Sequence, residues 1–142
     1  ALASDHAGFF LKEKLLGYLE GEKYEVKDLG SFSEEPVDYP EFGHQLAKSV
    51  SDGEFDTGIS ICGTGNGINM VANKHQGVRS ALCWNEEISR LARAHNDANV
   101  CALPARFITE SEAYLIVKTF LNTPFDGGRH QKRIDKISLK MY

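Results

Sequence analysis

Short apolar segments alternate with amphipathic segments along the whole sequence, and this alternation limits the possible folds more than any other feature. Apolar stretches of strand length occur at residues 1–4, 24–29, 57–62, 78–83 and 100–103. The intervals between them are long enough to hold the crossover connections that parallel strands require. The alternation therefore predicts an α/β fold, a three-layer, Rossmann-like arrangement in which helices cover both faces of a five-stranded parallel sheet.

Between the apolar segments, hydrophobic side chains recur with the 3.6-residue period of an amphipathic helix. Such stripes lie within residues 11–19, 42–50, 88–95 and 113–121. The chain has 142 residues, without an internal repeat or a long linker. We therefore expect residues 1–142 to form a single domain.

The C-terminal residues carry a concentration of positive charge. The net charge of the chain is -4, yet residues 126–142 contain five Lys and Arg against two Asp. We expect a helix here after two glycines, with its apolar residues on one side: Ile134, Ile137 and Met141. This apolar surface is too small to stabilise the helix alone. The overall acidity argues against a general nucleic-acid binder, and no apolar run approaches the ~20 residues of a membrane span.

The cysteines and histidines are too scattered for a disulfide framework or a metal site. Three cysteines, at positions 62, 83 and 101, form no close pair, which favours the cytoplasm. The histidines lack the spacings of metal ligands and lie at positions 6, 44, 75, 95 and 130. We therefore expect no metal. We expect no signal peptide, and because residues 1–4 look like the end of a strand, we expect a few native residues before them.

Residues 59–68, Ile-Ser-Ile-Cys-Gly-Thr-Gly-Asn-Gly-Ile, place a thiol between an apolar strand and a glycine-rich turn that opens a helix. The glycines at 63, 65 and 67 allow positive φ and can turn amide N–H groups toward one point, near the positive end of the helix. Thr64 adds a hydroxyl donor. The same field would lower the pKa of Cys62 below its usual value of about 8.5. The pattern predicts a base or nucleophile beside an anion site, and it matches neither a Walker loop nor a dinucleotide fingerprint.

Polar residues also follow the other predicted strands, at the edge where open parallel sheets bind ligands. After the first strand, Asp5 is either a helix cap or a carboxylate that faces the crevice, and His6 can donate a hydrogen bond or carry charge. His95, near the end of the fourth helix, is either a packed histidine or a proton shuttle. Arg129 and Arg133 are four residues apart on one helical face, and paired guanidinium groups suit a phosphate.

Six motifs together resemble the B-type ribose-5-phosphate isomerase family. They are Ser4-Asp-His-Ala-Gly8, Asp38-Tyr-Pro40, Cys62-Gly-Thr-Gly-Asn-Gly67, Ala72-Asn-Lys74, His95-Asn-Asp-Ala-Asn-Val100 and Gly127-Gly-Arg-His130. The resemblance covers essentially the whole chain. The family also contains allose 6-phosphate and galactose 6-phosphate isomerases, so the resemblance indicates the reaction more firmly than the sugar.

The resemblance implies an aldose–ketose isomerase of the pentose phosphate pathway that needs no cofactor. In it, Cys62 would move a proton between C2 and C1 of an open-chain sugar phosphate. The enediolate oxygen would be held by Thr64 and by the turn that contains Gly63, Gly65, Asn66 and Gly67. His95, assisted by Asp5, would open the sugar ring. Tyr39 and Asn96 would position the substrate, and the phosphate would be held by His6, Arg106, Arg129 and Arg133.

The resemblance further implies a homodimer with shared active sites, in which the C-terminal helix docks on the partner; a dimer of dimers stays open. We expect ribose 5-phosphate as the substrate. Allose 6-phosphate and galactose 6-phosphate are alternatives, because a pocket one carbon longer differs by only about 1–3 kcal/mol in binding. Two other functions are a non-catalytic sugar-phosphate-binding subunit and a thiol enzyme with a covalent intermediate.

Overall fold

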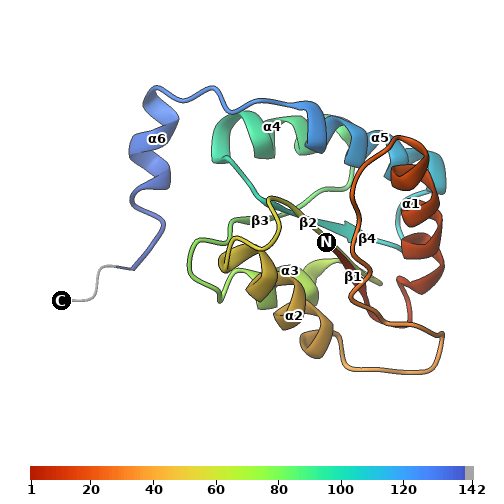
Figure 1. The fold of residues 1–142 in the computed structure, drawn as a ribbon. Helices are drawn as coiled ribbons and strands as arrows, with labels where there is room; N and C mark the ends of the chain where they lie inside the picture. The colour runs from red at the N-terminus through yellow and green to blue at the C-terminus, as the bar shows by residue number, and fades with distance from the viewer. Residues whose placement is uncertain (140–142) are drawn as a thin grey trace.

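Four parallel strands form the central sheet in the computed structural model, which describes residues 1–139 (Figure 1). They are β1 (Leu2–Ser4), β2 (Gly58–Cys62), β3 (Ser80–Leu82) and β4 (Val100–Pro104), in the order β1-β2-β4-β3. The predicted α/β class and parallel sheet are confirmed. Because all four strands run the same way, the loops that follow them meet at one edge, the carboxyl edge of the sheet.

The prediction of a fifth strand at residues 24–29 is wrong. Within this segment Asp28 pairs with β1 through an isolated bridge to Leu2. The amide of Ser4 then donates to the carbonyl of Gly30, one residue beyond the acceptor that a regular parallel ladder would use. Gly30 has φ +102°, far from the extended conformation of a strand. The segment therefore runs beside β1 without continuing its ladder.

Helices cover both faces of the sheet, so the three predicted layers are confirmed (Figure 1). One face is covered by α1 (Phe9–Gly21), α4 (Glu86–Asn96) and α5 (Glu110–Asn122), and the other by α2 (Tyr39–Ser51) and α3 (Asn66–Ala72). Successive strand residues point to opposite faces. Leu2 and Ile59 thus pack in the apolar cluster under α1, α4 and α5, whereas Ala3 packs in the cluster under α2 and α3. Among residues 1–139, none of the helices has the length and hydropathy needed to cross a membrane.

The C-terminal helix α6 (Arg129–Ile134) stands apart from the sheet, near the end of α4 (Figure 1). Gly127 and Gly128 precede it with φ values of +69° and +57°, a conformation that favours glycine. Beyond the helix, Ile137 and Leu139 expose 59% and 95% of their surface. Met141, expected on the same side, lies outside the described residues. Apolar surface in this segment is therefore left uncovered within one chain.

Candidate active site

Cys62 ends β2, and the turn after it opens α3. The carbonyl of Cys62 accepts a hydrogen bond from the amide of Ala105 (2.9 Å), and that of Gly63 accepts one from the amide of Arg106 (3.0 Å). These bonds tie the turn to the loop after β4. The Cys62 residue is 5% exposed and packs beside Ile68, so nearly all of its surface is withdrawn from bulk water.

The three glycines of the turn have different roles, and the expectation that all three provide positive φ is wrong. Of the three, Gly65 alone has a positive φ, +75°. A Cβ at Gly63 would lie 3.0 Å from Nη1 of Arg106, and a Cβ at Gly67 would lie 2.6 Å from the Tyr39 ring. Gly63 and Gly67 therefore allow a guanidinium group and a phenol to approach the backbone, which is a reason for glycine separate from φ.

Two polar residues of the turn are exposed to water. Thr64 and Asn66 are exposed, and Oγ1 of Thr64 accepts a hydrogen bond from the amide of Asn66 at 3.3 Å. The first amides of an α-helix have no acceptor within the helix and carry its positive end. The start of α3 can thus present amide and hydroxyl donors to an anionic oxygen.

Asp5 and His6 follow β1 and lie beside this turn. The amide of Asp5 donates to the carbonyl of Ile61 (3.1 Å), and its carboxylate accepts a hydrogen bond from the amide of Gly8 (3.0 Å). The Asp5 carboxylate therefore stabilises the turn that leads into α1. This role is similar to the helix-capping alternative, although the N-cap residue itself is Gly8. Nδ1 of His6 accepts a hydrogen bond from the amide of Val37 (3.1 Å), which leaves Nε2 as the N–H donor of the neutral ring.

His95 and Asn96 lie at the opposite, amino edge of the sheet. The carbonyl of Asn99 accepts a hydrogen bond from the amide of the first residue of β2 (2.9 Å). The carbonyl of Asn96 accepts one from Nε of Arg79 (3.2 Å), directly before β3. A five-residue strand such as β2 spans about 13 Å between its first and last Cα atoms. Cys62 and His95 therefore do not meet within one chain.

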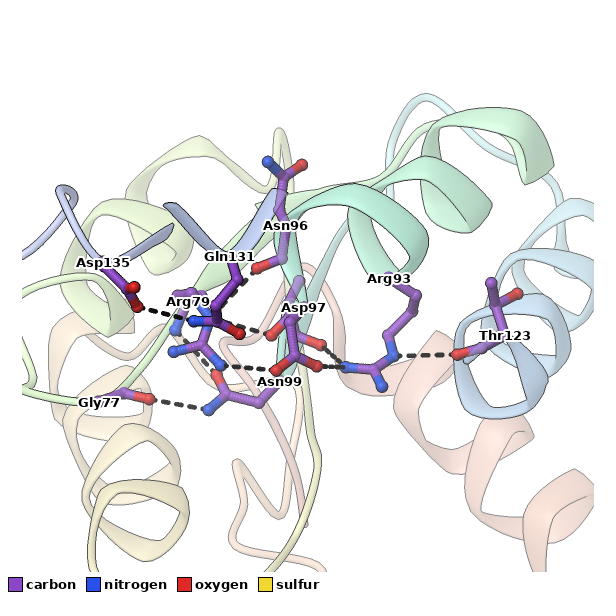
Figure 2. Close-up of polar contacts among 10 residues, drawn as sticks. Gly77, Arg79, Arg93, Asn96, Asp97, Asn99, Thr123, Gln131 and Asp135 are labelled. Atoms are coloured by element: carbon purple, nitrogen blue, oxygen red, sulfur yellow. Dashed lines mark hydrogen bonds and ion pairs between the residues drawn. The ribbon is translucent and has the colours of Figure 1, made fainter. Parts of the chain in front are cut away.

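Two arginines hold the end of α4 (Figure 2). Asp97 has φ +45°, and its carboxylate lies 3.1 Å from Nη1 of Arg93 and 3.3 Å from Nη2 of Arg79. Arg93 also donates through Nε to the carbonyl of Thr123 (3.3 Å). These contacts connect α4 to the segment before β3 and to the end of α5. They fix the backbone that carries His95.

The ring of His95 contacts Asp126 and His130. The two histidine rings stack with centroids 4.3 Å apart and planes 12° apart, and Nε2 of His95 lies 4.0 Å from Oδ2 of Asp126. Desolvation, and then nearby positive charge, lowers the pKa of His130 below its usual value. A cavity of about 350 Å³ is lined here by His95, Asn96, His130, Arg133, Ile134 and Ile137.

The predicted site residues thus form two groups within one chain. The carboxyl-edge group consists of Asp5, His6, Tyr39, residues 62–67 and Arg106. The amino-edge group consists of His95, Asn96, Arg129 and Arg133. The prediction that Asp5 assists His95 is not met inside a single chain. A site that uses both groups requires two copies of the chain.

Sequence reasoning missed side chains that support both groups. Lys12 is fully buried in α1, and its Nζ lies 2.7 Å from the carboxylate of Asp28 and 2.9 Å from that of Glu13. Lysine is rarely buried, and no pattern in the sequence indicated this one. His130 belongs to one of the six motifs, but the resemblance gave a role to Arg129 of that motif, and nothing in the sequence indicated that His130 would stack on His95.

Three comparisons with known proteins give consistent results. The sequence profile of a family described as Ribose/Galactose Isomerase matches residues 1–137. The chain is 42% identical to ribose-5-phosphate isomerase B of Escherichia coli K12 over 138 residues, which are 97% of this chain and 93% of that protein. It resembles the crystal structure of a ribose 5-phosphate isomerase from Thermotoga maritima with a TM-score of 0.94 and 52% identity, covering 96% and 94% of the two chains. For the Mycoplasma genitalium ribose-5-phosphate isomerase B with bound ribulose-5-phosphate, the TM-score is 0.92, the identity 46% and the coverage 96% and 91%.

Proposed function

Because the chain belongs to the ribose/galactose isomerase family, we propose that it interconverts ribose 5-phosphate and ribulose 5-phosphate by proton transfer at Cys62. The chain is an aldose–ketose isomerase, and its relatives are named for this reaction. The ligand of the Mycoplasma genitalium relative is ribulose-5-phosphate, which supports a five-carbon sugar. This reaction belongs to the non-oxidative branch of the pentose phosphate pathway.

One observation carries the proposal. Cys62 directly precedes a turn whose backbone is approached by the guanidinium group of Arg106 and the phenol of Tyr39. The thiol supplies a base, the arginine supplies positive charge for a phosphate, and the phenol supplies a hydrogen-bond donor. Acid–base isomerisation of a sugar phosphate needs these groups in one place.

The proton transfer follows from this arrangement. The Cys62 thiolate removes the proton from C2 of open-chain ribose 5-phosphate, and the electron pair of the C–H bond forms the C1–C2 double bond of an enediolate. Thr64 and the amides at the start of α3 stabilise the charge that develops on O1. The thiol then returns a proton to C1, while O1 gains a proton and O2 loses one, which completes the ketose. No electron leaves the substrate, so the reaction is redox-neutral.

The amino-edge group enters the reaction from a second copy of the chain. His95 of the partner would protonate the ring oxygen and open the furanose, while Asn96, Arg129 and Arg133 would hold the substrate and its phosphate. The separation of His95 from Cys62 within one chain supports a homodimer with shared sites. The exposed apolar residues after α6 support its docking on a partner. A tetramer would be a pair of such dimers.

The free thiols support a location in the cytoplasm. Cys62, Cys83 and Cys101 are all unpaired and buried. Proteins of reducing compartments keep their cysteines in this state.

The Cys62→Ser variant tests the proposal. We expect turnover of ribose 5-phosphate to fall at least 100-fold, because a serine hydroxyl is a far weaker base, while calorimetry still detects sugar-phosphate binding. In heavy water the parent should place deuterium on C1 of ribulose 5-phosphate. Cys83→Ala, which removes a thiol from the core, is the matched control and should retain turnover. Full turnover in Cys62→Ser would refute the role of the thiol. In the parent, a covalently modified Cys62 would favour a transferase.

Galactose 6-phosphate is the second candidate substrate, because the matching profile names galactose as well as ribose. The two sugars can be compared directly as kcat/KM values on one preparation, together with allose 6-phosphate. We expect ribose 5-phosphate to give the highest value. Comparable turnover of a six-carbon sugar would correct the substrate while leaving the proton-transfer mechanism intact.

A further inference from the structure

Three metal-ligating side chains that are separated in the sequence come together between α4 and α6. His95 lies in the last turn of α4, Asp126 in the following connection and His130 in α6. One ligand atom from each lies within 4.8 Å of the other two. The amide of Asp126 donates to the carbonyl of Ala94 at 2.9 Å, which holds the carboxylate beside His95. The scattered histidines predicted no metal site, but the fold brings two of them to one carboxylate.

We propose that His95, Asp126 and His130 bind a Zn²⁺ ion, with water completing its coordination. Two imidazoles and one carboxylate are a ligand set that zinc accepts, and three protein ligands leave the fourth position open. Tetrahedral zinc holds such atoms at about 2.0–2.2 Å, so neighbouring ligand atoms lie roughly 3.4 Å apart. Shifts of about 1 Å would bring the three ligand atoms to this distance. The His95 ring must also rotate out of its stack on His130, because the nitrogen lone pairs of two nearly parallel rings do not point at one ion. The side chains of His95 and Asp126 are 39% and 56% exposed, so both have room to move.

The charges around the site set its expected affinity. Arg129 and Arg133 lie on α6 beside His130 and oppose a cation, whereas Asp126 contributes one compensating negative charge. Both arginines are exposed, so water and salt weaken their effect. We therefore expect a micromolar Kd for Zn²⁺, far weaker than that of closed four-ligand sites. Mg²⁺ and Ca²⁺ prefer all-oxygen sites and should bind poorly.

Inhibition should follow from zinc binding, and this consequence rests on the proposed function. A Zn²⁺ ion on His95 takes the lone pair of one ring nitrogen, so the ring can no longer become the imidazolium that would protonate the ring oxygen of the sugar. Zinc should therefore inhibit isomerisation reversibly, and a chelator should restore activity. Zinc that binds these three residues without inhibiting would leave the metal site standing and refute the role of His95 in ring opening.

Calorimetric titration of the metal-free protein with Zn²⁺ tests the site without using activity. We expect one ion per chain, and we expect Asp126→Asn and His130→Gln each to raise the Kd at least tenfold. Asp126 is an exposed loop residue, so its variant should fold normally. His75→Gln is the matched control, because His75 and His44 form the other close histidine pair, with Nε2 and Nδ1 2.8 Å apart.

Cys62→Ser controls for zinc capture by the reactive thiol. Its Kd for Zn²⁺ should equal that of the parent, and a Co²⁺ complex of the parent should lack a sulfur-to-metal charge-transfer band. The proposal is overturned if the parent shows no saturable Zn²⁺ binding or if binding survives both Asp126→Asn and His130→Gln. Loss of Zn²⁺ binding in His75→Gln or Cys62→Ser would place the ion at that residue instead, and this result would also overturn the proposal.

Discussion

The absence of a side chain at Gly67 allows the Tyr39 ring to rest on the first turn of α3. A Cβ at this position would lie 2.6 Å from the ring, closer than any normal contact. Tyr39 would have to move, because the backbone of the turn is tied to its neighbours. Tyr39 begins α2 and is 40% exposed, so its ring has space to swing outward. A side chain at Gly67 should therefore disturb substrate positioning more than it disturbs folding.

Gly67→Ala should raise the KM for ribose 5-phosphate about tenfold, the equivalent of about 1.4 kcal/mol in binding, because the Tyr39 phenol no longer reaches the substrate. Steady-state kinetics measures this change. Gly17→Ala is the matched control: nothing lies within 4 Å of a Cβ there. It should leave KM unchanged and raise the free energy of unfolding by about 0.5–1 kcal/mol, because alanine favours a helix interior over glycine. A parental KM in Gly67→Ala would contradict the role given to Tyr39.

The sequence identified the residues of the turn better than their contacts. A glycine-rich stretch after an apolar strand was enough to locate Cys62 and the start of a helix. The spacing of the glycines could not show that Gly65 alone needs positive φ. Nor could it show that Gly63 and Gly67 make room for Arg106 and Tyr39, because those side chains arrive from distant parts of the chain.

At the scale of elements, Lys12 joins α1 to the segment that runs beside β1. Its Nζ lies 2.7 Å from Asp28, and Asp28 also accepts a hydrogen bond from the amide of Gly30 (2.9 Å). The rings of Phe9 and Phe32 lie 5.4 Å and 5.8 Å from the same Nζ. An ammonium group with a carboxylate partner and aromatic neighbours can be buried at acceptable cost. This contact holds residues 27–31 in place without a regular strand.

Lys12→Met should lower the free energy of unfolding by about 3 kcal/mol, because it leaves the partly buried carboxylate of Asp28 without its partner. Urea unfolding followed by circular dichroism measures the change. Glu13→Gln is the control, because it removes the second carboxylate near Lys12. The side chain of Glu13 is 48% exposed, so this variant should lose less than about 1 kcal/mol of unfolding free energy. Equal stability of the two variants would show that the Lys12–Asp28 pair does not anchor the segment.

The same region explains why a fifth strand was predicted. Residues 24–29 contain three apolar side chains, those of Tyr24, Val26 and Leu29, and Val26 and Leu29 do pack on the core. The pattern of apolar residues reflects this packing, but it does not show whether the hydrogen-bond ladder between the backbones is regular. The ladder is interrupted here, because the Ser4 amide donates to the carbonyl of Gly30, whose φ is +102°. The four other strands were predicted correctly because each coincides with an apolar run of strand length. β1, β2 and β4 are buried along their whole length, whereas the edge strand β3 is only partly buried and is shorter than the predicted segment 78–83.

At the scale of the molecule, the residues predicted for one site lie in two separate groups within a chain, and the sequence did not show this separation. A parallel sheet places the loop after each strand at the carboxyl edge, which correctly brought together Asp5, Cys62 and Arg106. His95 precedes β4, so the same rule places it at the amino edge. The motifs indicated that both groups take part in one reaction. Within a single chain the two groups lie at opposite edges of the sheet and cannot contact one substrate. The formation of each site by two chains is therefore a part of the mechanism that can be tested.

Mixing two inactive variants tests whether two chains build each site. In a mixed dimer of Cys62→Ser and His95→Gln, one site contains both substitutions and the other contains neither. Random assortment makes half of the dimers mixed, so co-refolding should recover about one quarter of the parental activity. Turnover of ribose 5-phosphate measures the recovery, and mass spectrometry of the intact dimers verifies the mixing. Cys62→Ser mixed with Thr64→Ala is the control: both residues lie in the carboxyl-edge group, so no site is complete and no activity should return. If verified mixed dimers of the first pair stayed inactive, His95 would not act on a partner's substrate, and the shared site would be wrong.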